Sequence, residues 1–394
     1  MILLNLALAT LAFLGHCISW IAINNRLHAL AIPSPIRKAA SLLTLLLIGL
    51  LPILYLTDTV NNPFKTGKAW AAFDNTQFGS IYLIYTWMMG CITLPWAIWH
   101  RYCLRLNPQL TSSRSIYIDL AQRLDAPPIG TTRTRILSWI PTNQIFHLSI
   151  HEKVLEIPRL PLQLEGLTIV HLSDLHFTGN IKKTYFNEVI REANELAGDI
   201  VAITGDLIDN PECMDWLPET LGHLKSRYGS YYLFGNHDAQ IPNKELLVDT
   251  LKQCGLDPIG GCWKIIKIGE SHMVIAGNQL PWFQPAPNME DCPAEQNGNR
   301  LFRLLLSHSP DQIYWAKQHD FDIMLAGHTH GGQIRFPVVG PITCPSRMGV
   351  KYASGIFFEP PTVMHVTRGI SGVQPIRLNC PPELTKLTLH SEQR

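Results

Sequence analysis

Charge is scarce in this sequence, and several familiar patterns are missing from it. Asp, Glu, Lys and Arg make up only 16% of the 394 residues while 46% are hydrophobic, a balance too apolar for an ordinary soluble enzyme. The formal net charge of +1 lacks the basic excess of nucleic-acid-binding proteins, so we expect no nucleic-acid partner. The nine cysteines are odd in number and form no Cys-x-x-Cys pair, which argues against a zinc ribbon or a disulfide framework.

Charged residues are absent from three long stretches near the N-terminus. No Asp, Glu, Lys or Arg occurs from Met1 to Asn25, and uncharged runs also cover residues 39–57 and 78–99. Each run is long enough to cross a bilayer as a helix and is apolar on every side, whereas a buried core helix normally keeps a polar face. The first run lacks the basic start and the cleavage site of a signal peptide. We therefore predict three transmembrane helices, at about residues 3–23, 39–57 and 78–99.

Basic residues in the short loops predict the orientation of these helices. The first loop holds Arg26, Arg37 and Lys38 without an acidic residue, whereas the lysines of the second loop are balanced by Asp58 and Asp74. Lys and Arg are enriched in cytoplasmic loops. The sequence therefore predicts a multi-pass protein of the inner (cytoplasmic) membrane, with its N-terminus outside and the chain after the third helix in the cytoplasm.

The chain divides into three regions on this interpretation. We expect a transmembrane region at residues 1–105, a juxtamembrane connector at 106–143 and a catalytic domain at 144–394. A short amphipathic stretch at residues 115–124 of the connector is suited to lying on the lipid headgroups. Alternating apolar residues from about 145 to 157 indicate an edge hairpin that leads into the catalytic domain.

The catalytic region alternates apolar, strand-like runs with polar segments rich in Asp, His and Asn. The runs cover residues 167–170, 199–204, 231–234, 304–306 and 321–326, and a helix at about 182–196 makes the first two a parallel βαβ unit. The polar residues that follow these runs are, in chain order, Asp174, His176, Asp206, Asp209, Asn236, His237, Asp238, His308, His328 and His330. Enzymes with α/β folds build their sites at such strand ends.

The types and spacing of these residues point to metal ions. Residues i and i+2 of an extended chain point the same way, so Asp174 with His176, and His328 with His330, can each face one site. Oxygen and nitrogen ligands without thiolate suit Mn²⁺, Fe, Zn²⁺ or Mg²⁺, and they are too many for one ion. Two ions about 3.5–4 Å apart can clamp both oxygens of a displacement at phosphorus. We predict two divalent metal ions per site, with manganese favoured.

The ordered motifs Asp-x-His, Gly-Asp, Gly-Asn-His, His and Gly-His-x-His, complete between Asp174 and His330, resemble those of the calcineurin-like metallophosphoesterases. Longer phrases, among them Gly-Asn-His-Asp and Gly-His-Thr-His-Gly-Gly-Gln, resemble the membrane-associated bacterial branch of that family. The resemblance implies an α/β fold, a two-sheet sandwich with flanking helices. It also implies a first metal held by Asp174, His176, Asp206 and His330, and a second held by Asp206, Asn236, His308 and His328.

The same resemblance gives roles to two further residues. His237 corresponds to the general acid or transition-state stabiliser, and Asp238 is a candidate to orient its imidazole. Trp282 and Arg335 are candidate substrate-binding residues. Trp282 belongs to a proline-rich loop, at about residues 279–300, which is either a lid that faces lipid or a variable surface loop.

The predicted activity is hydrolysis of a phosphoester or pyrophosphate bond by a metal-activated water at a membrane-anchored site. Some members of the wider group hydrolyse UDP-2,3-diacylglucosamine, and an anchored enzyme gains most from a substrate in the same bilayer. We therefore expect a lipid or lipid-linked phosphate as the substrate. Two alternatives stay open: a phosphatase or phosphodiesterase acting on a soluble nucleotide or phosphoprotein, and a non-catalytic membrane scaffold.

Overall fold

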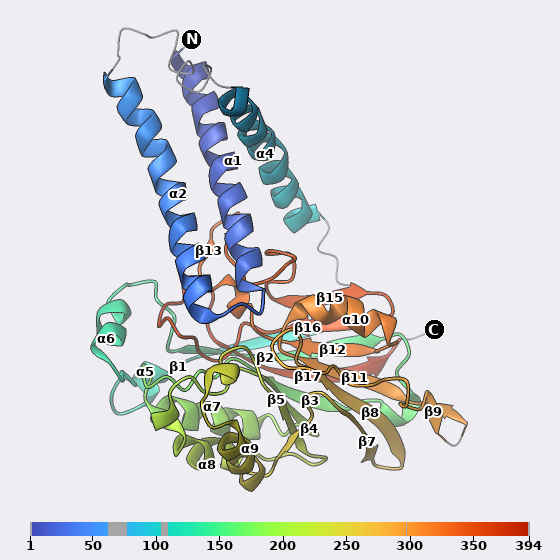
Figure 1. Ribbon diagram of the computed structural model, residues 1–394. Helices are drawn as coiled ribbons and strands as arrows, with labels where there is room; N and C mark the ends of the chain where they lie inside the picture. Colours follow the sequence, from blue (N-terminus) through green and yellow to red (C-terminus); the bar gives the residue numbers. More distant parts are fainter. Residues whose placement is uncertain (1, 62–76, 104–108, 297, 393–394) are drawn as a thin grey trace. The chain divides into compact units, whose positions relative to one another are not determined.

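The computed structural model describes residues 2–61, 77–103, 109–296 and 298–392. The chain forms two compact units (Figure 1). One unit comprises Met1–Leu106 with Pro337–Gly349, and the other comprises Asn107–Phe336 with Val350–Arg394. We call them the helical unit and the catalytic unit. A short segment from late in the chain therefore belongs to the helical unit.

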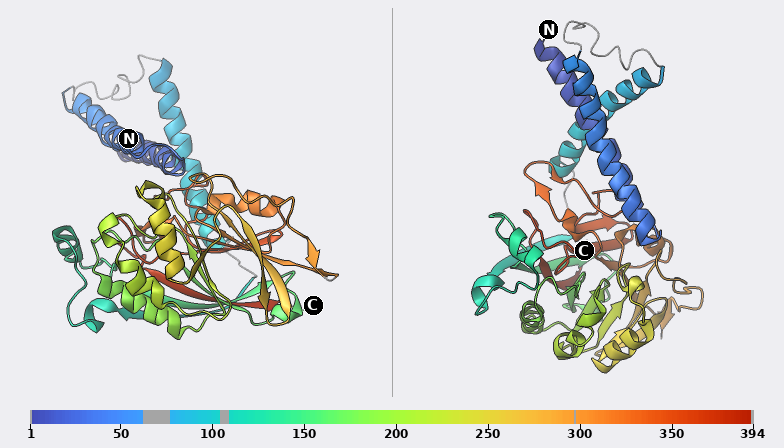
Figure 2. Two further views of the ribbon diagram at one scale, coloured as in Figure 1. Left: turned by 60° about the horizontal axis from the view of Figure 1, so that its bottom comes forward. Right: turned by 60° about the vertical axis from the view of Figure 1, so that its left-hand side comes forward.

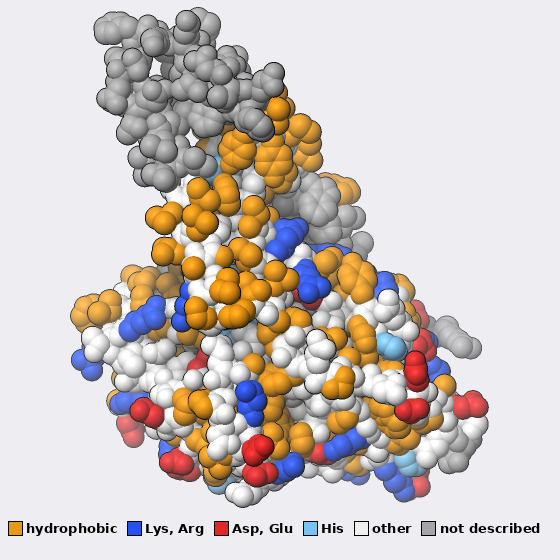
Figure 3. All heavy atoms as spheres, in the orientation of Figure 1, with side chains coloured by type: hydrophobic (Ala, Val, Ile, Leu, Met, Phe, Trp, Pro, Cys, Tyr) orange, Lys and Arg blue, Asp and Glu red, His pale blue; other side chains and the backbone are white. Residues whose placement is uncertain are grey.

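The helical unit contains α1 (Ile2–His28), α2 (Ser34–Asn61) and α4 (Gln77–Cys103). These helices include the three predicted runs, and their described side chains are largely hydrophobic at the surface (Figure 3). By length and composition, one helix segment of the described residues, Ala7–His28, is apolar enough to cross a membrane. The three-span arrangement therefore stays a prediction.

Small residues allow α1 and α4 to pack closely. A Cβ atom on Gly15 would overlap the backbone of Thr86, and one on Gly90 would overlap the backbone of Leu11. A polar contact also joins these two helices: His16 Nδ1 of α1 lies 2.6 Å from the Tyr82 hydroxyl of α4. Small residues and isolated polar contacts between helices are typical of packing in membranes.

Two mixed sheets form the centre of the catalytic unit (Figure 2). The seven-stranded sheet has the order β1-β2-β17-β3-β4-β5-β6 and the six-stranded sheet the order β15-β16-β12-β11-β8-β7. The strands of the first sheet are β1 (Leu110–Asp119), β2 (His147–Ile157), β3 (Thr168–Leu172), β4 (Ile200–Thr204), β5 (Ser230–Leu233), β6 (Leu256–Pro258) and β17 (Glu383–Ser391). Those of the second are β7 (Trp263–Ile268), β8 (Ser271–Asn278), β11 (Phe302–Ser307), β12 (Ile323–Ala326), β15 (Gly355–Glu359) and β16 (Thr362–Val366).

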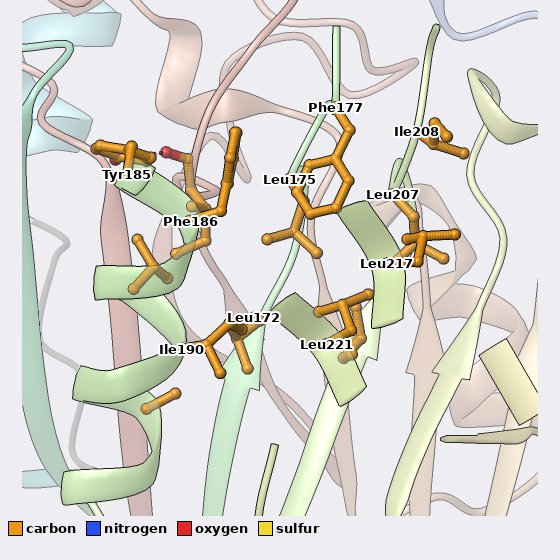
Figure 4. Packing of buried hydrophobic residues seen from close by; sticks show 14 of the residues in the cluster. Leu172, Leu175, Phe177, Tyr185, Phe186, Ile190, Leu207, Ile208, Leu217 and Leu221 are labelled. Carbon is orange, nitrogen blue, oxygen red and sulfur yellow. Dashed lines mark hydrogen bonds between the residues drawn. The ribbon is translucent and has the colours of Figure 1, made fainter. Parts of the chain in front are cut away.

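Two apolar clusters hold the catalytic unit together. Between the sheets, Ile169 and Leu387 of the first sheet join Leu304 and Leu325 of the second. On the outer face of the first sheet, Figure 4 shows Phe177 and neighbouring side chains packed with residues of the covering helices. The helices over the first sheet are α7 (Lys183–Glu195), α8 (Trp216–Thr220) and α9 (Lys244–Gln253), whereas α10 (Ile313–Gln318) lies beside β16 of the second sheet. This confirms the predicted two-sheet α/β arrangement.

Short elements complete the described chain. They are α5 (Leu120–Arg123), α6 (Thr132–Ser138), β9 (Glu295–Gln296), β10 (Asn299–Arg300), β13 (Arg335–Phe336), β14 (Gly340–Pro341) and 3₁₀ turns at Leu162–Leu164, Pro211–Cys213, Leu221–His223, Asp238–Gln240, Pro310–Gln312 and His330–Gly332.

The expectation of an amphipathic stretch at residues 115–124 is wrong. Residues 110–119 form β1, an antiparallel edge strand that pairs with β2, and β2 itself is one continuous strand in place of the predicted hairpin. A helix at this position would leave the edge of β2 without hydrogen-bond partners. Asp119 ends the strand and caps the following turn of helix, accepting a hydrogen bond of 2.9 Å from the Ala121 N–H.

Candidate metal centre

The ends of five parallel strands bring all seven predicted ligands together. The strands β3, β4 and β5 are parallel neighbours in one sheet, and β11 and β12 in the other. The residues that follow these strands point into one buried region. Its members Asp174, His176, Asp206, His308 and His328 each expose at most 4% of their surface to solvent. The C-terminal edges of both sheets thus supply a single site.

Asp174, His176 and His330 form one half of this region. The Nε2 atoms of His176 and His330 lie 3.3 Å apart. Asp174 Oδ1 lies 3.5 Å from His330 Nε2 and 3.9 Å from His176 Nε2. Three potential donors therefore face a common point.

Asp206, His308 and His328 form the other half, together with Asn236. His308 Nε2 lies 3.3 Å from Asp206 Oδ2, 3.2 Å from Asn236 Oδ1 and 3.1 Å from His328 Nδ1. Asp206 Oδ2 is also 3.5 Å from His176 Nε2 in the first half. The carboxylate of Asp206 thus stands between the two groups.

Hydrogen bonds behind the imidazoles determine which ring nitrogens face the centre as acceptors. The Nδ1 atoms of His176, His308 and His330 lie 2.7, 2.7 and 3.2 Å from Asp209 Oδ2, the Thr204 carbonyl and the Ser371 carbonyl. Carbonyl and carboxylate oxygens accept only, so each Nδ1 carries a proton, and in the neutral ring each Nε2 presents a lone pair. These lone pairs face one another and the carboxylates. A positive charge between them would offset the repulsion, so the residues fit a divalent cation.

The electrostatics of the imidazoles agree with this requirement. Burial alone lowers the pKa of a histidine, but the carboxylates of Asp209 and Asp206 outweigh it and raise the pKa of His176 to about 9. Asp206 and Asp174 likewise raise the pKa of His308 to about 9. Burial opposes ionisation of Asp206, yet the surrounding imidazoles hold its pKa well below the usual range. The field of the site therefore stabilises added positive charge.

Backbone conformation is unusual at the same residues. Asp174, His176, Asp206, His328 and His330 all have positive φ, between 47° and 67°. Such conformations cost roughly 1–3 kcal/mol each in non-glycine residues and gather at functional sites. Gly327 is needed for a different reason, because a Cβ atom there would lie 2.5 Å from Asp174 Oδ2.

The orienting residue of His237 differs from the prediction. Asp238 does not contact that imidazole, because its two oxygens accept hydrogen bonds from the backbone N–H groups of Asp206, Leu207, Ile208 and Gly235. Instead, Asp209 Oδ1 lies 2.5 Å from His237 Nδ1 while its Oδ2 contacts His176. Asp209 stands three residues after Asp206, and that spacing was the only signal for it in the sequence.

The two candidate substrate-binding residues lie in different settings. The Trp282 ring lies 4.7 Å from the ring of His328 and 5.4 Å from that of His308, so it borders the centre. Phe283 packs 5.7 Å from Phe234, and both aromatics of this loop are half-buried, so the lid and the surface loop both stay predictions. Arg335 donates to the Gly331 carbonyl at 2.8 Å and also contacts Ser354.

Arg377 has a structural role that the sequence did not reveal. Its side chain is completely buried and donates hydrogen bonds to the carbonyls of His330 (3.2 Å) and Arg368 (2.7 Å). It therefore fixes the loop that carries His330 rather than meeting a phosphate.

Comparison with known families gives this geometry a context. Residues 167–332, which include every predicted ligand, match the calcineurin-like phosphoesterase family. The chain carries a calcineurin-like metallophosphoesterase domain. It is a metal-dependent hydrolase, as the resemblance implied, and the residues present fit the divalent metals that this family uses.

Three relatives illustrate the breadth of similarity. The chain is 29% identical over 225 residues to phosphodiesterase YaeI of Escherichia coli, covering 56% of this chain and 81% of the relative. It is 26% identical over 415 residues to a transmembrane protein with metallophosphoesterase domain of Danio rerio, covering 96% and 87%. It is 24% identical over 303 residues to the UDP-2,3-diacylglucosamine pyrophosphatase LpxG of Chlamydia muridarum, covering 63% and 92%.

Proposed function

We propose that this protein is a membrane-anchored, dinuclear-metal phosphoesterase that cleaves a phosphoester or pyrophosphate bond of a lipid-linked substrate. The observation that carries the proposal is the convergence of lone pairs and carboxylates in two adjacent groups that share Asp206. Bound divalent cations, with manganese as our first choice, would neutralise charge on phosphate and make water a better nucleophile.

The chain's own residues divide the remaining work. Asp174, His176 and His330 would hold the first ion, Asn236, His308 and His328 the second, and Asp206 both. His237 is half-buried beside them, and its Nδ1 contacts the Asp209 carboxylate. A carboxylate on Nδ1 fixes the tautomer and leaves Nε2 to exchange a proton with substrate. We assign His237 that role.

A contact within the helical unit joins the end of α1 to the segment at residues 337–349. The Asn25 amide donates to the Ile342 carbonyl at 3.1 Å and accepts from the Cys344 N–H at 3.0 Å. Segment 337–349 continues into the catalytic unit at both ends. The side of the membrane for the chain after the third helix stays a prediction from the loop charges, which favour the cytoplasm.

Membrane attachment and one relative favour a lipid-linked substrate. LpxG is named as a UDP-2,3-diacylglucosamine pyrophosphatase, and 63% of this chain aligns with it at 24% identity. An enzyme held in the bilayer meets an amphiphile at high effective concentration, whereas a soluble substrate gains nothing from anchoring. A UDP-diacylglucosamine-type lipid is our first candidate.

Metal removal and substrate comparison test the proposal separately. Protein stripped by chelator should lose hydrolysis of an aryl phosphodiester and regain it with Mn²⁺. Activity that survives chelation would contradict the metal chemistry. With metal present, kcat/KM for UDP-2,3-diacylglucosamine in mixed micelles should exceed that for UDP-sugars and aryl phosphodiesters. Equal values would reject the lipid assignment while leaving the hydrolase intact.

A further inference from the structure

We propose that one exposed face of α6 docks on an anionic lipid surface and so brings phosphate-bearing lipid to the metal centre. The face comprises Arg133, Arg135, Ile136 and Trp139, and we call it the α6 face. All four residues belong to the catalytic unit. The inference rests on the proposed function in one respect, that the substrate is a membrane lipid.

Exposed apolar side chains mark the α6 face. The helix lies at the edge of the catalytic unit (Figures 1 and 2), and Ile136 and Trp139 are 56% and 74% exposed. At about 3.6 residues per turn these two side chains lie next to each other, with Arg133 on one side and Arg135 on the other. An apolar strip bordered by arginines suits a lipid interface, because the apolar groups leave water while the guanidinium groups reach the headgroups.

The opposite side of α6 is fixed to the protein. Thr134 is fully buried, and its hydroxyl donates to the Asn180 carbonyl at 2.7 Å. The Thr131 hydroxyl caps the helix by accepting a hydrogen bond of 3.3 Å from the Thr134 N–H. Just before it, a Cβ atom on Gly130 would lie 1.9 Å from the Gly179 carbonyl oxygen. A helix of seven residues is marginal alone, so these contacts hold it with the α6 face outward.

Charge identifies what covers the α6 face. No Asp or Glu occurs from Ala126 to His151. Within the described part of the chain, Arg133 and Arg135 form no ion pair with a carboxylate, and Arg133 contacts the Gln374 amide oxygen instead. A basic and apolar face complements the negative headgroups of a membrane. The face also belongs to the connector that follows the three predicted transmembrane helices, so we commit to a lipid surface rather than an acidic protein.

Hydrogen bonds join α6 to the loop that holds a metal ligand. His330 Nδ1 donates to the Ser371 carbonyl at 3.2 Å. Four residues further on, the Pro375 carbonyl accepts a hydrogen bond of 3.0 Å from Asn143 Nδ2, which also lies 3.0 Å from the Leu137 carbonyl of α6. A lipid drawn to the α6 face is therefore separated from the metal centre by a single loop.

Site-specific photo-crosslinking tests the inference in the full chain. Benzoylphenylalanine would replace Trp139 in protein reconstituted into phosphatidylglycerol–phosphatidylcholine nanodiscs, and lipid adducts would be measured by mass spectrometry. Phe13, 47% exposed on α1, is the membrane control. Leu162, 76% exposed in a 3₁₀ turn of the catalytic unit, is the control matched in exposure. We expect lipid adducts at positions 139 and 13, and none above background at 162.

The outcomes separate docking from anchoring. Adducts at position 13 without adducts at 139, or equal yields at 139 and 162, would overturn the docking face and leave membrane anchoring intact. Adducts at 139 alone would support docking and reject the spanning helix. No adducts at either position would overturn both. Adducts from 139 to a second copy of the chain would replace the lipid surface by a protein interface.

Lipid charge tests the role of the arginines. In nanodiscs of phosphatidylcholine alone, the adduct yield at position 139 should fall by about fivefold or more, because each basic residue near an anionic surface contributes roughly that factor. Arg135→Gln should also lower the yield in the phosphatidylglycerol discs. The yield at position 13 should change in neither case. A yield at 139 that is insensitive to both changes would contradict an anionic partner.

Kinetics provide a readout that does not depend on crosslinking. The double variant Ile136→Ser, Trp139→Ser should lower kcat/KM for the lipid substrate in anionic vesicles by about tenfold or more, because two apolar side chains no longer enter the lipid. Hydrolysis of a soluble aryl phosphodiester should stay unchanged, and the control Leu162→Ser should change neither rate. Equal losses on both substrates, or none on the lipid, would contradict the inference. A wild-type enzyme without preference for the lipid would reject the proposed substrate, while crosslinking would still decide the docking face.

Discussion

The catalytic unit contains two buried clusters of acidic and imidazole side chains, and they differ in the source of positive charge. In the metal centre, no Lys or Arg among the described residues contacts a carboxylate, and Arg377 approaches only the back of the His330 ring, with Nη2 3.4 Å from Nδ1. In the second cluster, between the sheets, Lys153 Nζ lies 2.7 Å from Glu383 Oε1 and 3.1 Å from His365 Nε2, while Arg368 Nε lies 2.8 Å from Glu383 Oε2. His171 completes this sheet-interface cluster through His365, with their Nδ1 atoms 2.9 Å apart.

The pKa values of the histidines in the two clusters are shifted in opposite directions. Burial, with Lys153 adding to it, lowers the pKa of His365 to about 4, whereas carboxylates raise the pKa of His176 and His308 to about 9. A cluster that contains its own cations is internally neutralised, and one that lacks them needs an ion from outside. Buried acid–histidine clusters are therefore informative about metals only after their cations have been counted.

The largest expected effect comes from Asp206→Asn, which removes the carboxylate shared by both halves of the metal centre. Turnover should fall by at least the roughly 10²–10³-fold that loss of one charge-stabilising group costs. Bound metal, measured by elemental analysis, should fall with it. Metal-free protein should also lose some stability, because the surrounding imidazoles stabilise the Asp206 carboxylate in the fold, so metal content and turnover carry the test.

The opposite pattern is expected for Glu383→Gln in the sheet-interface cluster. This change leaves Lys153 buried without its carboxylate, and breaking a buried ion pair costs about 3–5 kcal/mol. Tm should fall sharply while metal content per folded molecule stays constant. A variant that releases metal at an unchanged Tm would show that the two clusters are not distinct in the way proposed.

Apolar runs in the sequence predicted most of the fold, because the residues of such runs become buried when the chain folds. The runs at 167–170, 199–204 and 304–306 are β-branched or leucine-rich and buried on both faces, so each formed a central strand. The edge strand β1 escaped prediction because most of its side chains are exposed. Its conformation is set by pairing with β2, a contact with residues some forty positions away.

The same limit applies to the site. Side chains directly after buried strands were found because the strand ends place them together. Partners further along the chain were assigned by proximity in sequence, which misled for Asp238 and left Asp209 without a role. Whether a carboxylate meets an imidazole or backbone N–H groups depends on loop geometry at Asp206 and Gly235, which no local pattern reports.

Substitution of Asp209 and of Asp238 tests which of these two carboxylates orients the His237 imidazole. Asp209→Asn should reduce metal affinity or kcat by about 10–100-fold, the usual cost of losing a carboxylate behind a metal-binding histidine. It should also change the pH–rate profile, because the variant no longer holds the His237 tautomer by charge. Asp238→Asn should mainly lower Tm, since that residue caps backbone N–H groups. Reversed outcomes would restore Asp238 as the orienter of His237.

The smallest effect concerns the pH dependence of the sheet-interface cluster. The pKa of His365 is about 4 in the folded protein and near 6.5 when unfolded. Between these values the unfolded chain binds the extra proton, so this contribution to stability is complete above about pH 6.5 and is lost as the pH falls toward 4.

The variant His365→Gln keeps a polar side chain beside Lys153 and His171 but cannot titrate. Lowering the pH from 7.5 to 5 should therefore destabilise the wild type by about 1–2 kcal/mol more than the variant. Thermal melts of both proteins at each pH measure this difference, and titration of the metal centre, common to both, cancels. Parallel Tm curves would mean that His365 accepts its proton inside the fold, and the cluster would then not be neutralised by Lys153 and Arg368 alone.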